Sequence, residues 1–293
     1  MRSMGVISSM APVRVFDVET TGIDPSEHRV IEIAAFDLYP DNRIERVGAY
    51  LTNPGRSIPP EASAKHHLTD GDVASAPPFG AVWAHFANGP TVYAAHNCEF
   101  EQGYIPAPQE TRWICTYKCA LRAWPDAPGH SNQALRYWIG LDSMTGFDRK
   151  SAAVAHRAEP DAYVTTWLLM ILLGKHSLDE LLQWTKEPKF YARLPFGKHR
   201  SKKWAEVPAD YLEWMCDQRD MDADWRYGAK IELKRRELGA GQRQNGQRTS
   251  RQQSATNHNG RVDGCKRTKP KTVIVPQKSL GFRRIWDVIF PPD

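Results

Sequence analysis

The sequence has no hydrophobic run long enough to cross a bilayer. Its most strongly apolar stretch, Trp167 to Leu173, is much shorter than the roughly 20 residues that a membrane-spanning helix needs. The first ten residues contain no basic segment followed by a sustained apolar run, so a secretory signal is not expected. These absences predict a protein that stays in the cytoplasm and has no membrane partner.

Cysteine is also scarce. The 293 residues include five cysteines, an odd number at irregular spacings. This pattern suits neither a disulfide scaffold nor a zinc site built from paired cysteines. We expect all five to be free thiols.

Acidic residues are nearly missing from the C-terminal part of the chain. Residues 239–293 contain eleven Lys and Arg but only three Asp, a net charge of +8, whereas residues 1–238 carry 28 basic and 31 acidic residues, a net charge of −3. From 239 to about 271 large apolar side chains are almost absent too, which predicts a disordered, basic, low-complexity tail. The apolar segment around Trp286 could dock on the body or on an unidentified protein partner.

The remaining sequence alternates β-rich runs with helical patterns. Strands are predicted at residues 12–18, 30–38, 44–51, 91–95 and 113–115. Helices are predicted at residues 79–87, 116–124, 131–138 and 159–173, with another after Asn97. Strands first and helices interleaved later indicate an α/β fold, a sheet covered by helices. We place this domain at residues 12–178, a small basic and aromatic module at 190–238, and the tail at 239–293.

Acidic residues recur at three separated places in the predicted domain. Asp17 and Glu19 lie two residues apart on the first strand, so both carboxylates project from the same face. Like charges held close together need neutralising, and oxygen ligands of this kind suit Mg²⁺ or Mn²⁺. Such a pair alone is often only a solvated strand end. Further carboxylates follow, however, at Glu101 after a short strand and at Asp161 in the first turn of an apolar helix.

Three motifs carry a resemblance to a known family. They are Phe16 to Gly22 (FDVETTG), His96 to Glu101 (HNCEFE) and His156 to Asp161 (HRAEPD). In this order they resemble the DEDDh exonuclease superfamily, named for four acidic residues and a histidine, and within it the exodeoxyribonuclease X group. The resemblance covers about residues 12–174. It implies a ribonuclease-H-like mixed sheet and a 3′-to-5′ exonuclease that acts in DNA repair or end processing.

The resemblance also implies roles for individual residues. Two Mg²⁺ (or Mn²⁺) ions would be held by the four acidic residues Asp17, Glu19, Glu101 and Asp161. His156 would accept a proton from the attacking water, so the rate should rise through the histidine titration range. The terminal nucleotide would contact Thr21, His66, Asn97 and Phe100. Glu101 stands where the family has an aspartate; because the charge is retained, we expect activity to be retained.

The small module and the substrate leave alternatives open. Lys198, Arg200, Lys202 and Lys203 lie beside aromatic residues and form either a phosphate-binding patch or a solvated basic turn. The expected substrate is a single-stranded or frayed DNA 3′ end, with RNA possible. The alternatives are a proofreading subunit of a polymerase, an RNA-trimming exonuclease, or a catalytically impaired protein that only binds nucleic acid.

Overall fold

The computed structural model describes residues 11–238, and the predictions made for the tail lie outside these residues. A five-stranded sheet has the strand order β3-β2-β1-β4-β5. Three strands pair antiparallel, β1 with β2 and β2 with β3, whereas β4 pairs parallel with both β1 and β5. The strand bounds are β1 (Val13–Thr20), β2 (Val30–Leu38), β3 (Ile44–Leu51), β4 (Val92–Ala95) and β5 (Arg112–Cys115). The predicted fold class, a mixed sheet covered by helices, is confirmed.

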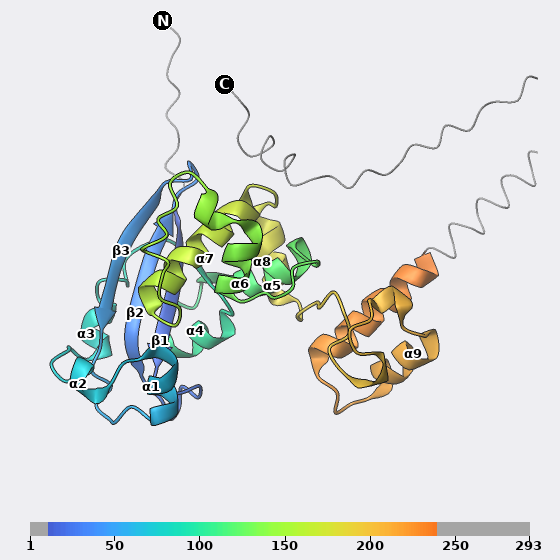
Figure 1. The fold of residues 1–293 in the computed structure, drawn as a ribbon, viewed down its shortest axis with the longest axis horizontal. Helices are drawn as coiled ribbons and strands as arrows, with labels where there is room; N and C mark the ends of the chain where they lie inside the picture. Colours follow the sequence, from blue (N-terminus) through green and yellow to red (C-terminus); the bar gives the residue numbers. More distant parts are fainter. Residues whose placement is uncertain (1–10, 239–293) are drawn as a thin grey trace, which may run out of the picture. The chain divides into compact units, whose positions relative to one another are not determined.

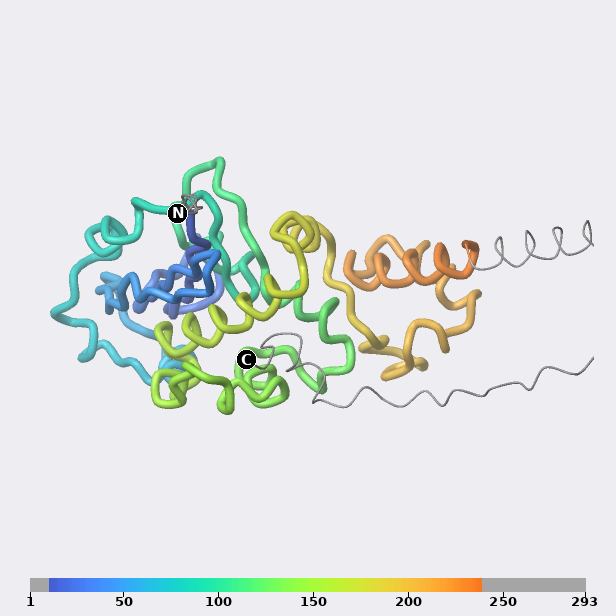
Figure 2. Tube along the Cα trace, turned by 90° about the horizontal axis from the view of Figure 1, so that it is seen from above, coloured from blue at the N-terminus to red at the C-terminus, as the bar shows by residue number. Residues whose placement is uncertain are grey.

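Nine labelled α-helices, α1 to α9, occur in the described chain, and a last α-helix covers residues 223–238 after them. Their bounds are α1 (Pro60–His66), α2 (Asp70–Val73), α3 (Phe79–Trp83), α4 (Glu99–Tyr104), α5 (Thr116–Ala123), α6 (Asn132–Ile139), α7 (Ala158–Leu173), α8 (Leu178–Lys186) and α9 (Ala209–Asp217). Helices α5 to α8 gather beside the strands (Figure 1). The yellow-green α7 runs along the blue strands in Figure 2, where it packs on β1 and β2.

Alternation along β1 assigns its side chains to two cores. Val13 and Val15 belong to the larger core, which includes the apolar residues of α7, whereas Phe16 and Val18 belong to a second core with Phe86. Because successive side chains of a strand point to opposite faces, Asp17 and Glu19 continue the row of Val13 and Val15. The strand therefore presents both carboxylates on the face that α7 covers.

Two predicted elements have different bounds in the structure. The first strand extends to Thr20 rather than ending at residue 18, so Glu19 lies inside it. The helix predicted at 79–87 ends at Trp83, and the chain then tightens into turns in which the His85 N–H donates to the Val82 carbonyl at 3.1 Å and the Phe86 N–H to the Trp83 carbonyl at 2.8 Å. Helices α1, α2, α8 and α9 were not predicted.

The chain divides into two compact units, residues 1–230 and 231–293. This division differs from the boundaries predicted at 178, 190 and 239, which remain predictions. Four of the five cysteines lie in the described part, and all four are free thiols as expected. No helix in residues 11–238 is both long and apolar enough to span a membrane.

Candidate active site

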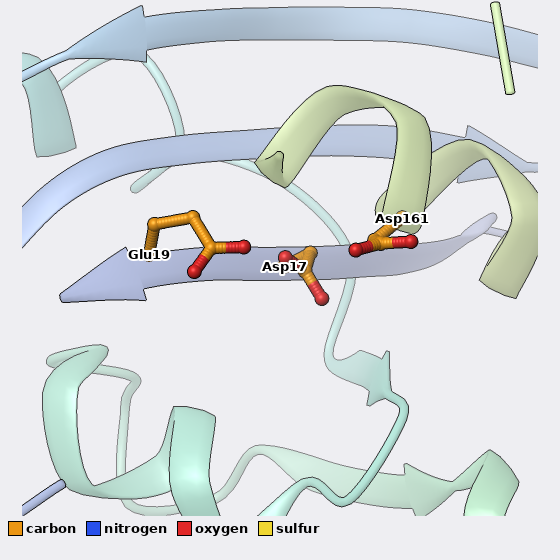
Figure 3. A group of neighbouring side chains, drawn as sticks. All are labelled: Asp17, Glu19 and Asp161. Atoms are coloured by element: carbon orange, nitrogen blue, oxygen red, sulfur yellow. The ribbon is translucent and has the colours of Figure 1, made fainter. Parts of the chain in front are cut away.

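Three carboxylates meet between β1 and the start of α7. One oxygen each from Asp17, Glu19 and Asp161 lies within 4.8 Å of the others. Figure 3 shows the first two on one side of β1 and Asp161 reaching toward Asp17 from α7. The apolar side chains of β1 determine which face of the strand packs against α7. This packing brings Asp161 next to Asp17, although the two residues are more than a hundred positions apart in the sequence.

The electrostatics of this group are unfavourable without a cation. Burial, followed by the charges of Asp161 and Glu19, raises the pKa of Asp17 well above its usual value. Burial and the charge of Asp161 raise the pKa of Glu19 to about 8. In residues 11–238 no Lys or Arg forms an ion pair with any of the three. Lys65 and Arg157 lower the pKa of Glu19 without forming an ion pair with it, and converging carboxylate oxygens that are not ion-paired are the donor set that a hard divalent ion prefers.

Glu101 reaches the same pocket from α4 but is not one of the three grouped carboxylates. Its side chain is 3% exposed, and its Oε2 atom has no hydrogen-bond partner. Burial raises the pKa of this carboxyl well above its usual value. A buried carboxylate oxygen without a partner is costly, so this atom is available to a ligand.

His156 lies immediately before α7, as the sequence predicted. Its backbone adopts a left-handed conformation, φ 58°, which is uncommon for a residue with a side chain. The backbone N–H of His156 donates to Oδ2 of Asp161 at 2.7 Å, and this hydrogen bond closes the turn. The conformation therefore places the imidazole and the Asp161 carboxylate at the same pocket.

The pocket around these groups has a volume of about 830 Å³, within the range of small-molecule sites. All four residues predicted to contact a nucleotide line it: Thr21, His66, Asn97 and Phe100. His66 is almost fully buried; its Nδ1 accepts the Leu68 N–H at 3.0 Å, and its Nε2 has no partner. Burial lowers the pKa of this imidazole. Lys198, Arg200, Lys202 and Lys203 do not line this pocket.

Two charged residues beside the site were missed by the sequence analysis. Arg157 donates to both carboxylate oxygens of Glu32, at 2.8 and 2.7 Å, and the Ala158 N–H donates to the same carboxylate at 3.0 Å. Glu32 lies opposite Glu19 in the pairing of β1 with β2. This contact attaches the start of α7 to the sheet. Its one visible sequence signal is a single acid inside an otherwise apolar run, Val30-Ile31-Glu32-Ile33.

Comparison with known proteins gives one consistent family. Residues 15–169 match the family model RNase_T, described as exonuclease. Exodeoxyribonuclease 10 of Escherichia coli strain K12 is 32% identical over 213 residues, which cover 71% of this chain and 92% of that protein. DNA polymerase III subunit epsilon of Treponema pallidum is 30% identical over 177 residues, covering 55% and 76%. A solved structure of exonuclease X in complex with 5′ overhanging duplex DNA aligns with 30% identity and a TM-score of 0.49, covering 59% of this chain and 99% of that one.

Proposed function

Because the chain belongs to the RNase_T exonuclease family, in the DEDDh group that includes exodeoxyribonuclease 10, we propose that it hydrolyses DNA stepwise from the 3′ end in repair or end processing. The observation that carries this proposal is the group Asp17, Glu19 and Asp161, three carboxylates in one pocket that form no ion pair with a Lys or Arg of residues 11–238. The proposed site of action is the cytoplasm.

The residues of the pocket fit a pair of divalent ions. Asp17, Glu19 and Asp161 would hold them, with Glu101 supplying its unpartnered Oε2. Mg²⁺ or Mn²⁺, when bound there, would neutralise the phosphate charge and make water a stronger nucleophile at neutral pH. The raised carboxyl pKa values support this fit, because a bound cation offsets the burial and the repulsion that raise them.

His156 is the proposed proton acceptor. Its imidazole must be neutral to take the proton of the attacking water, and it lines the pocket beside Asp161. The Glu32–Arg157 pair and the hydrogen bond from His156 N–H to Asp161 hold the backbone on both sides of this residue. The protein thereby fixes the imidazole relative to the carboxylates before a substrate arrives.

The terminal nucleotide would be held by the other pocket residues. His66 offers an unpartnered Nε2 for a hydrogen bond, and Thr21 and Asn97 add further polar groups. The Phe100 ring lies 5.1 Å from the Tyr104 ring and is only partly buried, so one face can stack on a base.

End-labelled oligonucleotides test the proposal. With Mg²⁺, a 5′-labelled single strand should give a ladder that shortens from the 3′ end, a 3′-labelled strand should release labelled mononucleotide at once, and EDTA should stop both. A ladder that shortens from the 5′ end, or products that persist in EDTA, would contradict it. RNA and duplex DNA of equal length distinguish a DNA exonuclease from an RNA-trimming enzyme.

Glu101 provides the test of the alternative that the protein only binds nucleic acid. If the longer acidic side chain still serves the site, Glu101→Asp should change turnover by less than about fivefold, whereas Glu101→Gln should lower it by more than about tenfold. Wild-type protein that binds DNA equally well in EDTA and releases no nucleotide with Mg²⁺ would favour the binding-only alternative.

A further inference from the structure

Positive charge is concentrated in one loop of the small module. Residues 193–203 contain five Lys and Arg and no acidic residue, whereas residues 204–224 contain seven Asp and Glu and one Arg. All five cations are exposed, and none forms an ion pair with any residue of 11–238. We call this segment the basic loop; its cations are Arg193, Lys198, Arg200, Lys202 and Lys203.

The basic loop is held at both ends. Arg193 and Lys203 form an antiparallel bridge, the Leu194 N–H donates to the Lys202 carbonyl at 2.9 Å, and the Ser201 N–H donates to the Leu194 carbonyl at 2.8 Å. Leu194 is fully buried, and Trp204 is 5% exposed. A Cβ on Gly228 would lie 2.3 Å from the Trp204 ring, so a glycine is required where this indole packs. The loop is therefore a fixed platform.

The turn of the basic loop rests on an aromatic surface. Gly197 has φ 69°, and a Cβ there would lie 2.7 Å from the Tyr211 hydroxyl. The Lys198 Nζ lies 5.1 Å from the centre of the Tyr211 ring, and the Trp214 ring lies 5.1 Å from the same ring. Trp214 is 46% exposed, which is unusual for so large an apolar side chain. Lys198 and the exposed ring of Trp214 thus both lie next to the ring of Tyr211.

We propose that the basic loop and Trp214 form a second nucleic-acid-binding site, separate from the catalytic pocket, that takes single-stranded DNA. The cations bind phosphates, and Trp214 stacks on a base. Unpaired strands are favoured over duplex because only an unpaired base exposes its face to an aromatic ring. The choice of DNA as the ligand rests on the proposed function. The positive charge and the exposed aromatic ring are observed independently of that function.

Charge supports a polyanion as the occupant. Clustered cations repel one another, and none of the five forms an ion pair in residues 11–238; the nearby acid Glu206 accepts the backbone N–H of Lys203 at 3.0 Å rather than a side-chain charge. A nucleic acid releases counterions when it binds Lys and Arg, which makes the affinity salt-dependent. An acidic protein would satisfy the charges equally well but would not use the exposed indole.

The test measures binding without catalysis. Full-length protein in EDTA is titrated with fluorescent oligothymidylate, with duplex of the same length and with polyglutamate. The test variant replaces Lys198, Arg200, Lys202 and Lys203 with Ala. The control variant replaces four exposed cations outside the loop and the pocket, Arg112, Lys150, Lys175 and Arg219, so both lose the same charge and both retain the tail. Circular dichroism verifies that each is folded.

The test variant should bind oligothymidylate at least about tenfold more weakly at low salt, and the slope of log affinity against log salt should fall by about 3. The control variant should lose much less. Trp214→Ala should weaken binding of the single strand by about fivefold or more and leave duplex binding unchanged. Equal losses in the test and control variants would overturn the proposal, and so would a test-variant loss that is the same for polyglutamate as for DNA.

Failure of this proposal is separable from failure of the proposed function. Nucleotide release by the unmodified chain with Mg²⁺ reports the catalytic pocket alone. If that release occurs while the test variant binds single strands as tightly as the control variant, only the second site is wrong.

Discussion

The two ends of β1 bury charge in opposite ways. Near its start, Arg14 donates to both oxygens of Asp37 at 2.8 Å and to the carbonyls of Phe86 and Asn88 at 2.9 Å. Near its end, Asp17 and Glu19 have no cation bonded to them in the described chain. The first arrangement satisfies a buried charge within the protein, which serves stability. The second leaves charge unsatisfied until a ligand arrives, which serves chemistry.

The largest effect should come from removing one unpaired carboxylate. Asp17→Asn should lower nucleotide release on the order of a thousandfold, because the central member of the group is lost. The same change removes a repelled buried charge, so the metal-free variant should unfold at a higher temperature than wild type. Added Mg²⁺ should raise the melting temperature of wild type and much less that of the variant. Turnover within tenfold of wild type would contradict the role assigned to Asp17.

At the start of β1, where Arg14 and Asp37 are paired, a substitution should lower stability and leave activity unchanged. Arg14→Met leaves Asp37 buried without its partner and should cost about 3–5 kcal/mol of unfolding free energy in urea titrations. Activity per folded molecule should stay at the wild-type level, because Arg14 lies outside the pocket. Replacing both partners, Arg14→Met with Asp37→Leu, should recover much of the lost stability. A fall in activity per folded molecule would mean that this end is not purely structural.

His96 contributes stability that acid removes, against the gain that the raised pKa values of Asp17 and Glu19 give the metal-free protein as pH falls. His96 directly follows strand β4, and its Nε2–H donates a hydrogen bond to the His130 carbonyl at 2.7 Å. Burial lowers the pKa of its imidazole to about 4. An unfolded histidine takes up a proton near pH 6.5, so stability is complete above that value and is lost as pH falls toward 4. Between pH 6.5 and 5 the loss should reach at most about 2 kcal/mol. The measurement is urea unfolding of wild type and of His96→Gln at both pH values, and the wild type should lose this amount relative to the variant; an equal pH dependence of the two would contradict the role of His96.

The smallest effect concerns the ion pair between Glu32 and Arg157, which lies near the end of β1 where Asp17 and Glu19 have no ion-pair partner. Glu32→Gln should weaken the attachment of α7 to the sheet and lower kcat by about tenfold, with KM nearly constant, because the groups that react are displaced while the pocket remains. Arg157→Lys keeps the charge and should lose less. An unchanged kcat with only a lower melting temperature would mean that the pair stabilises the fold without positioning His156 and Asp161.

The sequence motifs and the family resemblance together anticipated nine of the 22 residues that line the pocket, and local patterns placed the carboxylates among them. The alternation of β1 predicted that Asp17 and Glu19 share a face, and the helix start at 158 predicted Asp161 in a first turn near His156. The short polar segment after β4 predicted Asn97, Phe100 and Glu101 near one strand end. Each of these relations spans only a few residues, so strand and helix periodicity determine it.

Contacts between residues far apart in the sequence could not be predicted from local sequence patterns. Glu32 and Arg157 are 125 residues apart, and the unpartnered atoms of Glu101 and His66 exist only because packing removes their other partners. The carbonyl groups of Phe86 and Asn88, which follow the shortened helix α3, accept hydrogen bonds from Arg14, a residue more than seventy positions earlier in the chain.

The sequence by itself determined the α/β class, the order of the acidic motifs and the separation of a basic loop from the acidic part of the small module. Only the tertiary structure decided which charges are neutralised inside the protein and which are left for a ligand. The physical reason is that the propensity of a residue depends on its neighbours in the chain, whereas desolvation and ion pairing depend on neighbours in space.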